Sequence, residues 1–151
     1  MKIATSFTQA IGCLTHLAER DPETRLSGYA LAAHHGLSSS YLLKHLRSLA
    51  AAGILRAQSG AGGGYRLARP ASAVTLLDVF VAIEGPVLSF CNRAAKFSES
   101  DAVPESKVIG EVILRADRAF RETLEKTTIA EIVQEQKRLR SQTNSDDTAS
   151  V

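Results

Sequence analysis

The sequence predicts a mostly α-helical chain that carries one small β-hairpin. Apolar residues recur every three or four positions through most of the 151 residues, which is the spacing of a helix face. A glycine-rich run at residues 59–64 separates two short apolar segments, a pattern typical of a hairpin. Aromatic residues make up 5% of the chain and Trp is absent, so we expect Leu, Ile, Val and Ala to build the core.

Composition and charge narrow the classes of function. No stretch approaches the roughly 18 apolar residues of a membrane span, and the N-terminus lacks the apolar core of a signal peptide. Two cysteines, Cys13 and Cys91, cannot form a disulfide framework, so a cytoplasmic protein is expected. Residues 1–70 carry a net charge of +5 and residues 71–151 one of −3. This asymmetry indicates a polyanion-binding module joined to a different module, although scattered surface charge is the alternative.

Three helices are expected before the hairpin, over residues 5–19, 27–35 and 38–52. Gly36 permits a sharp turn between the second and third, and Gly53 stands where the third should end. Leucines at helical spacing are expected to pack the second and third helices against the first: Leu31, Leu37, Leu42, Leu46 and Leu49.

The hairpin strands are expected at residues 54–57 and 65–68. Thr75 and Asp78 have the spacing of a capping box, which opens a helix that Gly85-Pro86 ends. A second capping box, Thr128 to Glu131, opens the last helix, which should end near Arg140.

We therefore divide the chain into four parts. Residues 1–86 form the first domain, and residues 87–104 form a polar loop. Residues 105–140 hold a long helix and a short successor, and residues 141–151 form a disordered tail. Along the long helix, over residues 105–126, an apolar seam is expected to pair with a second copy: Ile109, Val112, Ala116 and Ala119.

The order helix, turn, helix and hairpin is that of a winged helix-turn-helix, whose helix after the turn enters the DNA major groove. Burial of the leucines leaves a polar face on this helix, to which we also assign Leu43. Serine hydroxyls and N-terminal amides suit phosphate, and cations can read guanine or neutralise phosphate. The alternative is a helical hairpin with a solvated basic face. The residues expected to contact DNA are Ser38, Ser39, Ser40, Tyr41, Lys44 and Arg47 from the helix, and Ser59, Gly62, Gly63, Tyr65 and Arg66 from the hairpin.

Three motifs carry a family resemblance: Ser40-Tyr41-Leu42, the spacing Leu49-x-x-x-Gly53-Ile54-Leu55, and the glycine-rich wing that continues as Tyr65-Arg66-Leu67. On these motifs, residues 3 to about 135 resemble the Rrf-two family of bacterial transcription regulators. The resemblance implies a winged-helix regulator, expected to be a repressor, that binds a palindromic operator in double-stranded DNA. It also implies a homodimer joined through the long helix.

The chain departs from this family in its cysteines. Cluster-binding members carry three cysteines in the loop before the dimerisation helix, where this chain has only Cys91. Glu99, Asp101 and Glu105 would be hard ligands for a soft cluster, so no iron–sulfur cluster or other cofactor is expected. Cys91 is the redox candidate, and the effector is a small molecule, an oxidant or none.

The wing and the third helix depart from the family as well. Ser59 stands where members often have an Arg that reaches the minor groove, so that contact would fall to Arg56 or Arg66. Leu43 replaces an acidic residue that reads bases, so the operator sequence does not carry over. A second hypothesis follows, namely a winged-helix protein-interaction module that has lost specific DNA binding.

Enzymatic and metal sites are not expected. No Lys follows the glycine run, so it is no phosphate-binding P-loop, and no catalytic constellation appears elsewhere. His34-His35 at a helix end suit the helix dipole, and His45 suits a packing position. His16 follows Cys13 by three residues, which is the spacing of a ligand pair, but no second pair lies nearby in the sequence.

Overall fold

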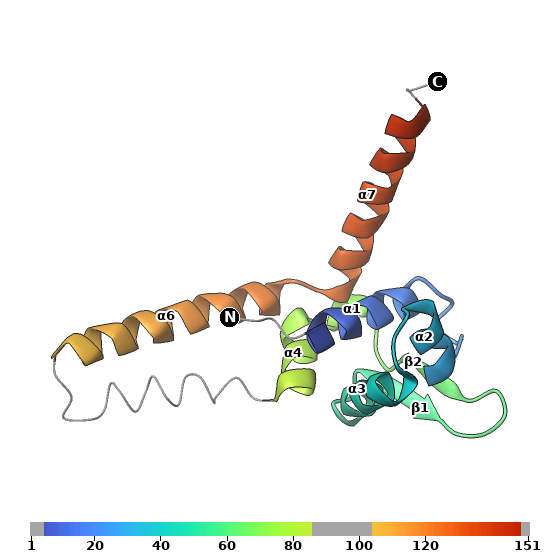
Figure 1. Ribbon diagram of the computed structural model, residues 1–151, viewed down its shortest axis with the longest axis horizontal. Helices are drawn as coiled ribbons and strands as arrows, with labels where there is room; N and C mark the ends of the chain where they lie inside the picture. The colour runs from blue at the N-terminus through green and yellow to red at the C-terminus, as the bar shows by residue number, and fades with distance from the viewer. Residues whose placement is uncertain (1–4, 86–103, 149–151) are drawn as a thin grey trace.

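The computed structural model describes residues 5–85 and 104–148 (Figure 1). This part of the chain holds six α-helices, one short 3-10 helix and a two-stranded antiparallel sheet, so the predicted fold class is confirmed. In chain order the elements are α1 (Thr5–Ala18), α2 (Gly28–His34), α3 (Ser39–Ala51), β1 (Leu55–Gln58), β2 (Gly64–Leu67), η1 (Ala71–Ala73), α4 (Leu76–Glu84), α6 (Pro104–Lys126) and α7 (Ile129–Thr148).

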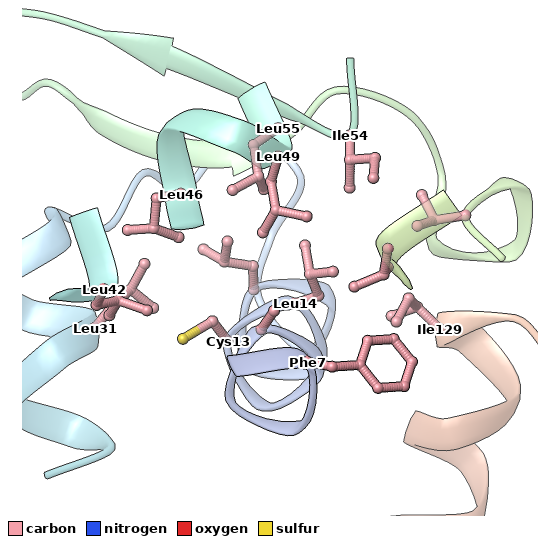
Figure 2. Close-up of a cluster of buried hydrophobic side chains, with 14 of the residues drawn as sticks. Phe7, Cys13, Leu14, Leu31, Leu42, Leu46, Leu49, Ile54, Leu55 and Ile129 are labelled. Atoms are coloured by element: carbon pink, nitrogen blue, oxygen red, sulfur yellow. The ribbon is translucent and has the colours of Figure 1, made fainter. Parts of the chain in front are cut away.

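The core forms around α1, whose Leu14 lies among buried side chains from α2, α3, β1 and α7 (Figure 2). Leucines of α2 and α3 approach it from one side and Ile129 of α7 from the other. Complete burial of one such side chain stabilises the fold by about 1.5–3 kcal/mol. Four of the five leucines expected in this core are fully buried, and Leu37 is half-buried.

Side-chain caps fix where three of the helices begin. The Ser27 hydroxyl accepts a hydrogen bond from the Ala30 amide at the start of α2. Thr75 and Asp78 form the predicted capping box of α4. The Thr128 amide and hydroxyl donate to the Glu131 carboxylate over 2.6 and 2.9 Å, and these two hydrogen bonds lower the pKa of Glu131. Local sequence signals therefore place these helix starts correctly.

The hairpin depends on two glycines. In the register of the sheet, Arg56 faces Arg66 and Gln58 faces Gly64. A Cβ at Gly63 would lie 2.3 Å from the Gln58 carbonyl oxygen, and one at Gly64 would lie 2.6 Å from the Leu26 carbonyl oxygen. Larger residues do not fit at either position, so the glycine run serves the close approach of backbone to backbone.

The last two helices extend from this core in different directions (Figure 1). The Phe80 ring of α4 makes edge contacts with Phe7 of α1 and Phe120 of α6, each with ring centroids 5.4 Å apart. The junction of α6 and α7 is hydrogen-bonded to the start of α4, since the Leu76 amide donates to the Thr127 carbonyl over 2.8 Å. The N-terminal part of α6 extends as an arm away from the core (Figure 1).

The expectation of a disordered tail from residue 141 is wrong for residues 141–148, which continue α7 to Thr148. Polar side chains support this extension, because Ser141 and Thr143 donate to the carbonyls of Lys137 and Leu139, one turn earlier. Such bonds allow hydroxyl residues to lie within a solvent-exposed helix. Residues 149–151 lie outside the described part.

Candidate nucleic-acid interface

The N-terminus of α3 has no side-chain cap. Ser38 occupies the N-cap position, yet its hydroxyl makes no cap hydrogen bond and lies 3.1 Å from the Ser40 hydroxyl. The first backbone bond of this helix joins the Leu42 amide to the Ser38 carbonyl, so the preceding amides have no partner within α3. Unpaired amides and the positive end of the helix dipole make this terminus suited to an anion such as phosphate.

Two exposed cations continue this surface. Lys44 and Arg47 lie four and seven residues after Ser40, which places all three on one helix face. Neither cation forms an ion pair with another residue in the part of the chain that the structure describes. Tyr41 is 43% exposed beside them. The structure therefore brings Ser40, Tyr41, Lys44 and Arg47 together on one surface, with Ser38 exposed and Ser39 half-buried at the start of the helix.

Leu43 is not on this outward face, which corrects the expectation from the sequence. Its side chain is half-buried and packs against the core. It fills the space beside Gly28 of α2, where an added Cβ would lie 2.4 Å from the Leu43 side chain. The close approach of α2 to α3 thus accounts for Leu43, and no base contact is assigned to it.

Arg66 is held by other residues of the same chain, which counts against its predicted role in DNA contact. Its guanidinium forms an ion pair with Glu23 at 3.1 Å and also donates to the Pro22 carbonyl, and the side chain is only 18% exposed. Both partners lie in the loop between α1 and α2. Arg56, opposite Arg66 on the other strand, is exposed, so it is the better placed wing cation of the two.

Tyr65 also serves the fold. Its backbone exchanges two hydrogen bonds with Leu26, of 2.8 and 3.1 Å, and its side chain packs against the core. Arg69, counted in the basic half, pairs with Asp78 at 3.0 Å and donates to the Ala73 carbonyl. By contrast, Ser59 and Gly62 are exposed in the wing loop, and Gly63 is half-buried.

The histidine in α3 has the packing role expected of it. His45 is buried, and its ring makes an edge contact with Tyr41 at 4.6 Å between centroids. Burial, followed by the nearby charge of Lys44, lowers the pKa of His45, while Glu84 of α4 opposes this effect. His45 is therefore mainly neutral at physiological pH and supports α3 from behind the exposed face.

Comparison with known proteins shows the family to which the chain belongs. The sequence pattern of the Rrf2 family, described as an iron-dependent transcriptional regulator, matches residues 3–135. The chain belongs to the Rrf2 family. This is the family that the three motifs of the wing and helices resemble, and its fold is the winged helix that the described residues form.

Individual relatives agree with this assignment. YwgB of Bacillus subtilis, named as an HTH-type transcriptional regulator, is 34% identical over 85 residues, which cover 56% of this chain and 54% of YwgB. The chain thus matches about half the length of that relative. Rv1287 of Mycobacterium tuberculosis, also named as an HTH-type regulator, is 26% identical over 87% of this chain and 81% of its own.

Solved structures in the comparison have the same fold. CymR, the global cysteine regulator of B. subtilis, superposes with a TM-score of 0.69 at 26% identity, over 89% of this chain and 98% of CymR. A transcriptional regulator from Listeria innocua reaches a TM-score of 0.71 at 28% identity, over 89% and 87% of the two chains. No helix in the described part is long and apolar enough to cross a membrane.

The iron in the description of the Rrf2 family raises the question of whether an iron–sulfur cluster fits this chain. Such clusters are held mainly by several cysteine thiolates. The chain has two cysteines, and burial in the core raises the pKa of the Cys13 thiol to about 11. Cys91, the redox candidate, lies outside the described residues. One remaining thiol does not make a cluster site, so the residues present do not fit this group.

The predicted seam of α6 is exposed in the single chain. Ile109 and Val112 are 60% and 47% exposed, and Val108 beside them is 61% exposed. Ala116 and Ala119 continue the same stripe, also exposed. An apolar stripe of this kind commonly marks a contact surface.

Proposed function

We propose that this chain is a DNA-binding transcription regulator that acts as a homodimer on a palindromic operator and represses the genes it controls. The observation that supports the proposal most directly is the surface at the start of α3. There the uncapped helix terminus lies beside Lys44 and Arg47, which have no competing ion pair among the described residues. Membership of the Rrf2 family supports the same function.

In this proposal each part of the surface has a physical task. The α3 amides and serine hydroxyls bind one phosphate and fix the register of the helix on the duplex. Lys44 and Arg47 then reach base edges or further phosphates of the major groove. Arg56 brings positive charge to the backbone or minor groove from the wing. Two copies related by a two-fold axis would match the two halves of a palindrome.

The exposed stripe of α6 supports the homodimer. Pairing of two such stripes would remove Ile109 and Val112 from water, which is the main driving force for association of apolar helices. Since α6 is an arm that extends away from the core, it can pair while the α3 surface stays open (Figure 1).

One observation favours a second candidate, a protein-interaction module. Arg66 is held by Glu23 and the wing lacks an Arg at Ser59, so the wing presents less positive charge than the sequence suggests. A gel shift with DNA from upstream of the chain's own coding region separates the two candidates. We expect binding that survives excess unrelated DNA and weakens steeply with salt. Equal competition by every sequence, or no shift at low salt, would favour the interaction module.

Repression has its own test. Transcription in vitro from the same upstream region should fall when the protein is added at the concentration that shifts the DNA. A rise in transcript would show activation and contradict the repressor assignment while leaving DNA binding intact.

A further inference from the structure

Three of the four histidines meet where α1 and α2 end. His16 lies in the last turn of α1, His34 is the last residue of α2, and His35 is the C-cap of α2. The ring centroids of His16 and His34 are 4.0 Å apart, and those of His34 and His35 are 4.9 Å apart. One ring nitrogen from each residue can be chosen so that all three lie within 4.8 Å of one another.

The fold brings two histidines of α2 beside His16, which the sequence did not reveal. From the sequence, His16 pairs with Cys13 one turn earlier and has no second pair nearby. In the structure the Cys13 side chain is fully buried in the core, whereas His16 lies against the end of α2. The close approach of the two helices at Gly12, where an added Cβ would be 3.4 Å from the His35 ring, creates the cluster.

The electrostatics of the cluster favour a bound cation. The three rings lie close enough for one nitrogen of each to reach the same ion, and a neutral imidazole offers its lone pair to a metal. The Nε2 atom of His35 is buried and has no hydrogen-bond partner within the described ranges. Both α1 and α2 end here, and the negative ends of two helix dipoles favour positive charge.

The neighbouring charges have opposite effects. Arg20 lowers the pKa of His16 and would repel a cation, whereas Glu19 acts in the opposite direction. Glu19 is held by Arg140 of α7 at 3.2 Å, so its carboxylate is already partly neutralised. Arg20 is exposed to solvent, where salt screens its repulsion of a cation, whereas the Glu19 side chain is only 22% exposed.

We propose that His16, His34 and His35 form a binding site for a divalent transition-metal cation. Imidazole nitrogens suit Zn²⁺, Cu²⁺ or Ni²⁺, and they do not suit Mg²⁺, which prefers oxygen ligands. Three protein ligands leave a coordination position open, as in exchangeable or reactive metal sites. Because the cluster ends one residue before the turn at Gly36, a bound ion would tie α1 to the segment that leads into α3.

Zinc titration of the untagged full chain tests the proposal. The Cys91→Ser variant serves as the parent, so that this thiol does not compete for metal. Calorimetry should show one Zn²⁺ per chain, and Mg²⁺ should give no heat. His34→Ala should weaken Zn²⁺ binding at least tenfold, and since His34 is exposed this variant should keep the fold, which circular dichroism checks.

A matched control is available in the fourth histidine. His45→Gln leaves all three ligands in place and should bind Zn²⁺ as the parent does. The side-chain nitrogen signals of His16, His34 and His35 should shift on zinc addition in NMR spectra, while those of His45 should not. Equal affinity of parent and His34→Ala, or shifts confined to other residues, would overturn the proposal. Binding only at millimolar zinc would also overturn it.

Discussion

The charge that α3 and the wing present to solvent is set residue by residue. Lys44, Arg47 and Arg56 are exposed, whereas Arg66 and Arg69 are held by carboxylates of the same chain. An arginine in such a pair must break it before it meets a phosphate, so it contributes less to binding than a free one. The proposed interface therefore rests on fewer cations than the composition of the first half suggests.

Cys13 is expected to be chemically inert in the folded protein. Its thiol is buried and its pKa is raised to about 11, so little thiolate forms at neutral pH. In the Cys91→Ser variant, Cys13 is the only thiol. A disulfide reagent should label it slowly without denaturant and fully in concentrated urea. Rapid labelling of the native variant would contradict its place in the core.

The stability of the protein should depend on pH through His45. Burial and the nearby charge of Lys44 lower the pKa of His45 below the ordinary value of 6.5. The charge of Glu84 acts in the opposite direction. The unfolded chain therefore binds a proton at higher pH than the folded one, and stability falls as pH drops below about 6.5. His45→Leu removes the group that binds this proton. The free energy of unfolding of the variant should therefore fall less than that of the wild type between pH 7.5 and 5.5. Equal losses in urea titrations would contradict the assignment.

Side-chain contacts between residues far apart in the sequence cannot be predicted from local patterns. The partner of Arg66 is Glu23, 43 residues earlier, and no local pattern reveals a pair that only the fold creates. The inward packing of Leu43 is hidden from the sequence for the same reason, since the gap beside Gly28 exists only once α2 packs on α3. The exposed serines, Lys44 and Arg47 could be predicted because helical periodicity alone separates them from the buried leucines.

Local signals in the sequence predict the helices and strands better than they predict these long-range side-chain contacts. Caps at Ser27, Thr75 and Thr128 act within four residues, and they set helix starts that the sequence predicts. The end of α7 was missed because no glycine or proline stops it, and polar residues continue a surface helix at little cost. The arrangement of the histidines was missed because it joins two helices that are separate in the sequence.

The α6 helix carries the prediction of a dimer. Ile109→Asp with Val112→Asp places charge in the exposed stripe, so it should convert the proposed dimer to a monomer in sedimentation velocity. Operator affinity should then fall at least tenfold, because one half-site cannot replace two. Leu139→Asp, a matched change at an exposed apolar residue of α7, should leave the dimer intact. A dimer that survives the double change would refute this interface.

At the scale of the whole molecule, the structure separates three tasks. The core around α1 holds α3 and the wing in place, α6 carries an apolar stripe away from them, and the ends of α1 and α2 gather three histidines. A metal at the three histidines, or a second copy paired on α6, would alter how α3 is presented without touching its exposed face. The central claim is that this face binds DNA.

That claim is tested most directly by the salt dependence of DNA binding in the Lys44→Ala/Arg47→Ala variant. Fluorescence anisotropy with upstream DNA, between about 50 and 200 mM salt, should show affinity lowered by roughly 1–3 kcal/mol for each side chain that reads a base. If both contact phosphate instead, the salt slope should fall by about 2. Lys137→Ala, which removes one exposed charge from α7, should bind like the wild type. A double variant with unchanged affinity and unchanged slope would contradict the placement of DNA on α3.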